Sequence, residues 1–364
     1  MHFNQLNYLL NKIFKKKQSE SKIKKIKKCI LHIGTEKTGT STIQSFLANN
    51  RNQFACEKVL YPNVSGSTGG SQWEFAAYAI DRPWEKGLGE KLNIFNESDR
   101  DKFRSELLNK FANEVHKHGY ANLLIISSEH FHSRLNTIKE IEKLKNFLHK
   151  FVDTVEVLLY VRRQDRLAIS YYSTKLKNAA VNPVVFPIKK EGSLPYYFDY
   201  EKIFNNWRTV FGQKAMHVRI FDSSEFQNGN LLEDFCSALG LNIEGKSIPG
   251  PVNESFNQIG ANFLLAVNRH YAGKSSKERD TLCRFISDNY SGKNYPASRA
   301  EAFNFYQQFK DSNERLRCMA FPSRTKPLFD EDFYDYPEEN PSLVTNYEDT
   351  IEVAIKIWQV LGKK

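Results

Sequence analysis

Paired cysteines, repeated segments and long apolar runs are all missing from this 364-residue sequence. Its five cysteines are widely spaced and none forms a CxxC pair: Cys29, Cys56, Cys236, Cys283 and Cys318. That pattern excludes a cysteine zinc site and a disulfide framework, and it favours a reducing compartment. No segment of about 20–50 residues repeats, which argues against a solenoid. The 40% hydrophobic content is still enough for a sizeable core, so a folded chain is expected.

Net charge is small over most of the chain, although the total is +10. Residues 1–28 hold nine lysines and a single acid, Glu20, so this segment carries +8 and the rest of the chain only +2. A nearly neutral body argues against a nucleic-acid-binding face. We therefore expect no specific nucleic-acid partner.

The segment 1–28 is predicted to be a basic and amphipathic tail. Apolar residues follow helical spacing within 3–14, and the lysines come after them. The apolar part is too short to span a bilayer, and a signal peptide would carry its charges first. Such a segment suits peripheral contact with an anionic membrane, and a solvated lead-in is the equal alternative. We expect a cytoplasmic protein, with the inner face of the membrane as the possible site of contact.

From Cys29 onward, apolar runs typical of buried strands alternate with helix-like stretches. The expected strands are 29–34, 58–62, 121–127, 155–161 and 216–221. The expected helices between and after them are 41–54, 99–118, 137–151, one starting at 164, and 231–239. Continuous apolar strands separated by helices predict an α/β fold with a parallel sheet flanked by helices. Right-handed crossovers then bring the carboxyl ends of the strands to one edge, where a site is expected.

The last third of the chain is predicted to be mainly helical. Helices are expected at 257–271, 277–290, 299–313 and 346–361, with a proline-rich interval at 320–341. No clean linker separates this part from the preceding strands. We therefore predict a single α/β domain over 29–364, whose part 256–364 is mainly helical.

The segment 32–46, HIGTEKTGTSTIQSF, places a turn rich in glycine and threonine between a strand and a helix. Backbone N–H groups at a helix N-terminus, with hydroxyls and a lysine beside them, bind phosphate-like anions. Gly34 and Gly39 have the spacing of a Walker loop, but a Walker lysine follows the second glycine, whereas Lys37 precedes it. An ordinary strand-to-helix turn capped by a hydroxyl is the alternative.

A second pattern follows the strand expected at 155–161. Arg162 comes at the strand end, and Ser170 lies eight residues further on, two turns into the next helix. An NTPase would carry an acid after such a strand to hold Mg²⁺, whereas an arginine suits an anion held without a metal. Ordinary surface ion pairs of Arg162 and Arg163 are the alternative.

Together these two patterns resemble a known family. The loop KTGTST resembles the 5′-phosphosulfate loop of sulfotransferases that use 3′-phosphoadenosine 5′-phosphosulfate (PAPS), and Arg162 with Ser170 resembles their 3′-phosphate signature. Segments 207–240 and 312–339 also look like bacterial members, so the resemblance spans about residues 29–340. It implies a P-loop-like three-layer sandwich and metal-free transfer of a sulfuryl group from PAPS to a hydroxyl or amine.

The resemblance also implies roles for individual residues. Lys37 would stabilise the charge that develops on the bridging oxygen of the donor. The loop would hold the 5′ end of the nucleotide, and Arg162 with Ser170 would hold the 3′-phosphate. The implied donor-binding set is Lys37, Thr38, Gly39, Thr40, Ser41, Thr42, Arg162 and Ser170, with no metal ligand.

A general base is expected after the strand at 121–127, because the acceptor must lose a proton. Glu129, His130 and His132 follow that strand, and related sulfotransferases place a glutamate or histidine in this region. Glu129 is the first choice, with His130 and His132 as alternatives. An ion pair for Glu129 and helix capping by the histidines would be the purely structural explanation.

Two features depart from the family pattern. Thr42 and Ile43 stand where an aromatic often stacks on adenine, and the Arg-Lys-Gly segment of many cytosolic members is absent. Ser323, Arg324 and Lys326 are positional substitutes for that segment.

The acceptor is expected to be a glycan or glycolipid, as for bacterial relatives. Trp73, Tyr78, Arg82 and Trp84 suit an acceptor-side loop, and core packing explains these aromatics equally well. A P-loop kinase or NTPase and a non-catalytic nucleotide-binding scaffold at the membrane surface are the competing functions.

Overall fold

Five parallel strands form the centre of the protein in a computed structural model that describes residues 24–64, 70–82, 92, 94–187, 195–250, 255–292, 296–341 and 346–361. The strands are β1 (Ile26–Gly34), β2 (Val59–Leu60), β3 (Leu123–Ser127), β4 (Val152–Val161) and β5 (Met216–Ile220). They lie in the order β2-β3-β1-β4-β5, and each neighbouring pair is parallel. The prediction of an α/β fold with a parallel sheet is confirmed.

Strand β1 begins at Ile26, three residues before the predicted start. Lys28 is already in register with Leu123 of β3 and Thr154 of β4. Ile26 is buried while Lys27 is exposed, and the Lys28 ammonium pairs with Glu156, so these lysines fit the solvent-facing end of the sheet. The remainder of the predicted basic tail, residues 1–23, lies outside the described residues.

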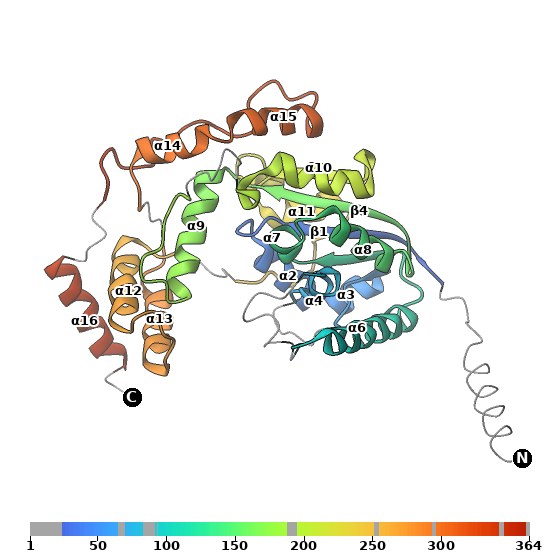
Figure 1. The fold of residues 1–364 in the computed structure, drawn as a ribbon, viewed down its shortest axis with the longest axis horizontal. Helices are drawn as coiled ribbons and strands as arrows, with labels where there is room; N and C mark the ends of the chain where they lie inside the picture. The colour runs from blue at the N-terminus through green and yellow to red at the C-terminus, as the bar shows by residue number, and fades with distance from the viewer. Residues whose placement is uncertain are drawn as a thin grey trace, which may run out of the picture.

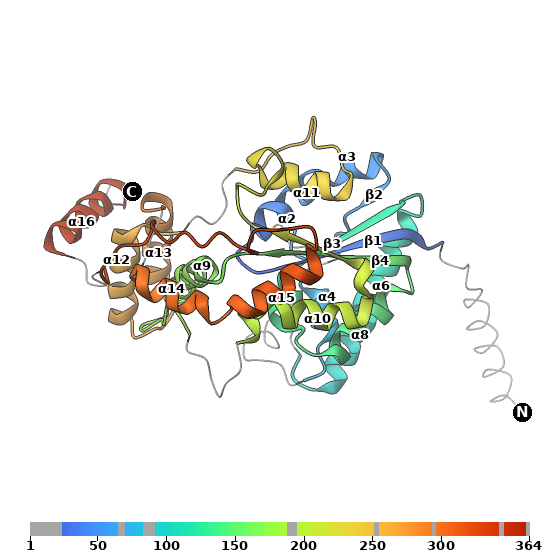
Figure 2. The same ribbon diagram turned by 90° about the horizontal axis from the view of Figure 1, so that it is seen from above.

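Helices cover both faces of the sheet and make three layers (Figure 2). One face carries α2 (Thr40–Asn49), α3 (Arg51–Cys56) and α11 (Leu231–Leu239). The other carries α4 (Glu74–Ala79), α6 (Glu97–Lys117), α8 (Ile138–Leu148) and α10 (Tyr200–Phe211). Successive strand residues alternate between the two cores: Ile30 belongs to the apolar cluster of the first face, with Phe46, and Leu31 to that of the second, with Trp207.

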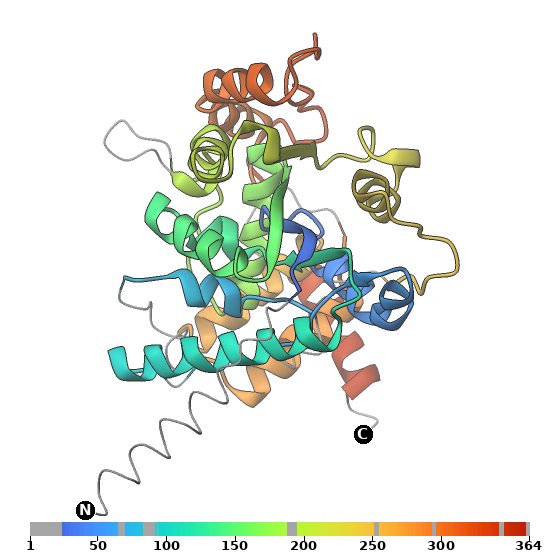
Figure 3. The ribbon, with the colours of Figure 1, turned by 90° about the vertical axis from the view of Figure 1, so that its right-hand side faces the viewer.

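The C-terminal part is helical, as predicted, and some of its helices pack with α9 beside the sheet. Helices α9 (Gln164–Lys177), α12 (Gln258–His270), α13 (Lys277–Asn289) and α16 (Tyr347–Leu361) lie together in Figure 1 and share a buried apolar cluster. Helices α14 (Arg299–Gln307) and α15 (Lys310–Ala320) return toward the sheet, where α15 packs on α10 (Figure 3). None of the helices in the described ranges has the length and apolar character that a membrane crossing requires.

Two predicted helices are each broken into two. The helix expected at 41–54 divides at Asn50, whose side-chain amide donates to the carbonyls of Phe46 and Ser247. The helix expected at 299–313 divides where Phe309 turns inward against Phe198 and Phe305. The short helices α4 and α7 (His130–Arg134), and the strongly amphipathic α10, were not predicted.

The topology brings four loops to the carboxyl edge of the sheet. Strand β1 lies between β3 and β4, so the segments that follow these three strands emerge side by side, next to the one after β5. In open parallel sheets, ligands bind at such a point, where successive connections leave in opposite directions. Both sequence patterns begin on this edge.

Candidate active site at the carboxyl edge of the sheet

The loop after β1 depends on two glycines. Gly34 has φ 85°, and a Cβ there would lie 3.3 Å from the Cα of Glu129, so this glycine lets the segment after β3 approach the loop. Gly39 has φ 69°, and a Cβ there would overlap Leu231 Cδ2. Both positions therefore combine a left-handed backbone with close packing. Between them Lys37 also has a left-handed φ of 63°, which is uncommon for a residue with a side chain.

The N-terminus of α2 faces this loop without a side-chain cap from the described residues. Its first-turn N–H groups, on Thr40, Ser41 and Thr42, have no carbonyl partner within the helix, which makes them donors for an anion. The earlier loop N–H groups are used: Thr35 donates to the Tyr160 carbonyl, and Glu36 donates to His132. Any anion-binding amides of the loop therefore come after Glu36.

A cavity of about 470 Å³ lies against this loop. It brings together most of the residues that the sequence analysis selected: Lys37, Gly39, Thr40, Ser41, Thr42, Glu129, His130, Arg162 and Ser170. Two selected residues do not line it. Thr38 is fully buried, and its hydroxyl donates to the Thr35 carbonyl at 2.6 Å, so the Thr38 side chain braces the loop from within.

The two sequence patterns are in direct contact. The Arg162 guanidinium donates to the Lys37 carbonyl at 2.9 Å, and the Lys37 ammonium donates to the Thr174 hydroxyl at 2.8 Å, one helical turn beyond Ser170. Burial, and next the nearby Lys177, lower the pKa of Lys37, and burial, followed by Arg166, lowers the pKa of Arg162. Two buried positive groups so close together are stabilised when an anion binds beside them, so this arrangement favours anion binding.

Glu129 and His130 face the same cavity from the start of α7. The side-chain amide of Gln44 donates to Glu129 Oε2 at 2.7 Å and is itself buried on α2. Among the described residues, His130 Nδ1 is buried without a hydrogen-bond partner. Both side chains are therefore placed where a proton acceptor for a cavity ligand would be needed.

His132 lies behind the loop instead of lining the cavity. It is fully buried, its Nδ1 accepts from the Glu36 N–H at 3.3 Å, and its Nε2 lies 3.0 Å from the Tyr197 carbonyl. Burial lowers its pKa to about 4, so the imidazole is neutral at neutral pH. With both nitrogens engaged away from the cavity, His132 is poorly placed to act as a base, and Glu129 and His130 are better placed.

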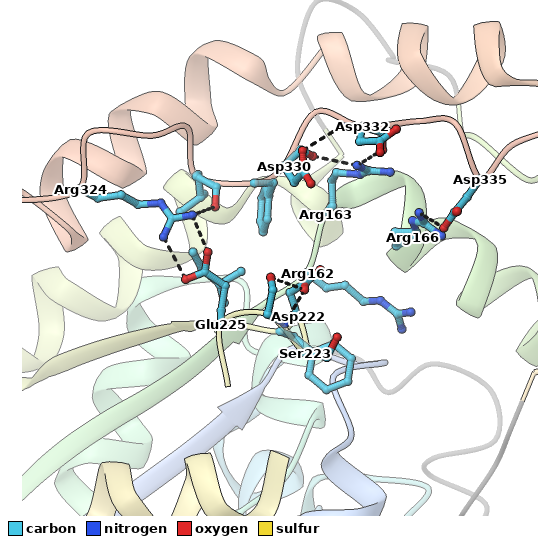
Figure 4. A pocket seen from close by; sticks show the side chains of 15 residues that line it. Arg162, Arg163, Arg166, Asp222, Ser223, Glu225, Arg324, Asp330, Asp332 and Asp335 are labelled. Carbon is cyan, nitrogen blue, oxygen red and sulfur yellow. Dashed lines mark hydrogen bonds and ion pairs between the residues drawn. The ribbon is translucent and has the colours of Figure 1, made fainter. Parts of the chain in front are cut away.

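A second cavity of about 390 Å³ shares Arg162 and Phe221 with the first, and Figure 4 shows the side chains that line this second cavity. The other arginines there are engaged: Arg163 with Asp165 and two backbone carbonyls, and Arg324 with Glu225. Lys326 also pairs with Glu225, and these bonds lower the pKa of that carboxyl to about 2. The suggested substitutes Arg324 and Lys326 thus already hold a carboxylate. Arg162, by contrast, contacts the loop and lies over the Phe221 ring.

The aromatic segment suggested for the acceptor has structural partners. The Tyr78 ring lies 4.6 Å from that of Phe147, and Arg82 pairs with Glu140. Trp73 precedes α4 and is half-buried, and Trp84 lies outside the described residues. In the described ranges, no three His, Cys, Asp or Glu side chains come together in a way that could hold a metal ion.

Several residues around the cavity were not selected from the sequence. They are Glu36, Gln44, Thr174, Tyr197 and Phe221. Two of them carried a local signal: Glu36 directly precedes Lys37 in the loop, and Gln44 lies four residues after Thr40 on the same face of the helix that starts there. Thr174, Tyr197 and Phe221 reach the site only through tertiary structure.

Comparisons with known proteins give few matches. No family model matches the chain. An uncharacterized protein of Archaeoglobus fulgidus is 29% identical over 226 residues, which cover 60% of this chain and 60% of that protein, so the chain matches less than two thirds of its relative. A solved structure of a sulfotransferase from Alicyclobacillus acidocaldarius aligns with a TM-score of 0.42 and 12% identity, over 80% of this chain and 94% of that one.

Proposed function

We propose that this protein is a sulfotransferase that moves a sulfuryl group from PAPS to a hydroxyl or amine of an acceptor, a glycan or glycolipid. One observation carries the proposal: Arg162, at the end of β4, donates to the carbonyl of Lys37 in the loop after β1. Two anion-binding patterns that are more than a hundred residues apart therefore border one cavity. A nucleotide with phosphate groups at two positions is the ligand such a cavity suits.

The donor's two ends would be held by different elements. The first-turn amides of α2, with the Thr40 and Ser41 hydroxyls, suit the 5′-phosphosulfate, because an uncapped helix N-terminus favours negative charge. Arg162 and Ser170 suit the 3′-phosphate. The second cavity begins at Arg162 and Phe221 and leaves room for the rest of the nucleotide.

The transfer needs one bond made and one broken. The acceptor oxygen or nitrogen attacks sulfur, the bond between sulfur and the bridging oxygen breaks, and adenosine 3′,5′-bisphosphate leaves. Lys37 would stabilise the negative charge that develops on the departing oxygen. Glu129 would take the acceptor proton, with its carboxylate held by Gln44. His130 is the alternative proton acceptor.

The charge at the end of β4 favours this donor over ATP. A P-loop NTPase places an acid there for Mg²⁺, whereas this chain has Arg162. The lysine also precedes the second loop glycine, so it leaves the loop at a different point from a Walker lysine. A kinase or NTPase remains the competing enzyme, and it would require ATP with Mg²⁺.

The test is transfer of ³⁵S from labelled PAPS to a panel of glycans and glycolipids without added metal. Wild type should label at least one acceptor, and Lys37→Ala should lose about 99% or more of that rate, since removing one such transition-state contact costs about 10²–10³-fold. Lys58→Ala is the matched control, because Lys58 has a similar φ of 62° and is exposed at the start of β2. Equal rates for the two variants, or turnover only with ATP and Mg²⁺, would refute the proposal.

We also propose a cytoplasmic location with peripheral membrane contact through residues 1–28. The proposal rests on the +8 charge of that segment. Flotation with anionic vesicles should recover the full chain and lose a variant without residues 1–23. Equal recovery of both would exclude this contact.

A further inference from the structure

Three residues behind the loop after β1 form a closed cycle of hydrogen bonds through their side-chain and backbone groups. The Glu36 N–H donates to His132 Nδ1 at 3.3 Å, His132 Nε2 lies 3.0 Å from the Tyr197 carbonyl, and the Tyr197 hydroxyl donates to Glu36 Oε2 at 2.9 Å. The three residues come from the loop after β1, from α7, and from the 3₁₀ turn Tyr196–Phe198. This Glu36–His132–Tyr197 cycle thus ties three separate segments together.

The cycle works with only one arrangement of protons on the imidazole. A carbonyl can only accept, so His132 Nε2 must carry the proton that it shares with Tyr197. His132 Nδ1 is then without a proton and can accept from the Glu36 N–H. Full burial keeps the imidazole neutral, which preserves this arrangement. An imidazolium would present a second donor to the Glu36 N–H and open the cycle.

Lys37 is the residue that this cycle holds. Its backbone is left-handed, a conformation that persists only where the surroundings fix it. On its C-terminal side the Lys37 carbonyl accepts from Arg162, and on its N-terminal side the cycle fixes the N–H and carboxylate of Glu36. The direction in which the Lys37 side chain leaves the loop therefore depends on both attachments.

The cycle also touches the helix that carries Ser170. The Tyr197 ring lies 4.8 Å from the His132 ring on one side and 5.2 Å from the Tyr171 ring on the other. Tyr171 is the neighbour of Ser170 on α9. We infer that Glu36, His132 and Tyr197 are positioning residues that hold Lys37 in its geometry for transfer relative to Ser170. This inference rests on the proposed function.

Two hydroxyl deletions on adjacent residues test it. Tyr197→Phe removes only the bond to Glu36, and Tyr196→Phe, the matched control, removes a bond from the same turn to the Leu135 carbonyl. Sulfuryl transfer by Tyr197→Phe should have kcat lowered about tenfold to a hundredfold, because misplacement by about 1 Å costs that much. Its KM for PAPS should stay within about threefold, since Arg162 and Ser170 are unchanged. Tyr196→Phe should match wild type in both constants.

Substitutions of His132 test its two hydrogen bonds one at a time. His132→Asn keeps an acceptor near Glu36, and His132→Gln keeps a donor near Tyr197, so each should recover part of the kcat that His132→Ala loses. A merely structural role would instead lower the stability of all variants and leave kcat per folded molecule unchanged. Equal kcat in Tyr197→Phe, Tyr196→Phe and wild type would overturn the inference.

A readout without turnover keeps this result distinct from failure of the proposed function. In ¹⁵N-histidine-labelled full-length protein, the imidazole spectrum should show His132 protonated on Nε2 alone, and Tyr197→Phe should shift its Nδ1 resonance while Tyr196→Phe does not. A doubly protonated or Nδ1-protonated His132 would refute the cycle even if the enzyme is active. If the spectrum agrees but no PAPS turnover is found, the proposed function fails and Lys37's positioning role falls with it.

Discussion

The substitution Gly39→Ala tests the packing that shapes the N-terminus of α2. Gly39 has φ 69°, and an added Cβ would overlap Leu231 Cδ2 and lie 3.2 Å from Phe221 Cε2. The left-handed backbone alone costs an alanine about 1–2 kcal/mol, and overpacking adds about 1–3 kcal/mol. We expect a loss in unfolding free energy of about 2–5 kcal/mol.

Gly240→Ala is the matched control for this substitution. Gly240 has φ 66°, close to that of Gly39, but a Cβ there would meet nothing within 4 Å. Both substitutions share the backbone cost and the small gain from a stiffer unfolded chain, so their difference isolates the packing against Leu231. The control should lose about 1 kcal/mol of unfolding free energy. In the double variant Gly39→Ala/Leu231→Ala, the loss should be smaller than the sum of the two single losses, because Leu231→Ala removes the overlapping atom.

Urea unfolding gives the free energies, and calorimetric titration of adenosine 3′,5′-bisphosphate gives the ligand affinity. Gly39→Ala should also weaken bisphosphate binding about tenfold, because relieving the overlap shifts the first-turn amides of α2. Gly240→Ala should bind as wild type does. If Gly39→Ala is no less stable than Gly240→Ala and binds equally well, the close packing of α11 on the loop is wrong.

Three further predictions concern ionisable groups at the site. Glu129→Gln should lower turnover about 10²–10⁴-fold and leave bisphosphate affinity within about twofold, as titration and rate assays would show; near wild-type turnover would remove Glu129 from the mechanism. In the pH profile of kcat/KM, the pKa of the alkaline limb should lie below the ordinary lysine value of 10.5, because burial lowers the pKa of Lys37. Glu36→Gln should lower the pKa of this limb further, because the Glu36 carboxylate raises the Lys37 pKa. A limb with a pKa at or above 10.5 would contradict this prediction. Burial lowers the pKa of His132 from 6.5 to about 4, so between these pH values the unfolded chain binds a proton that the folded chain does not. The unfolding free energy should therefore fall as the pH drops from 6.5 toward 4, by about 2 kcal/mol at pH 5. Urea unfolding of His132→Gln should lack that part of the pH dependence.

The centre of the sheet could be predicted from sequence because β1, β3 and β4 contain apolar runs next to helical stretches, whereas β5 alternates apolar and polar residues. Local pattern was also enough for α11, whose bounds match the expected 231–239. It failed where tertiary contacts decide: Asn50 ends α2 by bonding to Ser247, nearly two hundred residues away. Helix α10 was not predicted, although its buried residues follow helical spacing: Tyr200, Ile203, Phe204 and Trp207.

The site was predictable to the extent that its residues belong to local patterns. Each of the two patterns, the loop after β1 and the pair Arg162 and Ser170, lies within a short segment of sequence, so its internal spacing could be recognised. Tyr197 could not be, because its contacts with Glu36 and His132 arise only when three segments meet. His132 was selected with Glu129 because both follow the same strand, and the structure separates them: Glu129 lines the cavity, whereas His132 is buried and its two nitrogens are engaged behind the loop.

Calorimetric titration of metal-free adenosine 3′,5′-bisphosphate against adenosine 5′-phosphate tests the central claim most directly, because the two ligands differ only in the phosphate assigned to Arg162 and Ser170. We predict that the bisphosphate binds at least about tenfold more tightly, and that Ser170→Ala reduces this ratio, since a charged hydrogen bond contributes about 1.5–3 kcal/mol. Equal affinity for the two ligands, or tighter binding of ATP with Mg²⁺, would contradict the account.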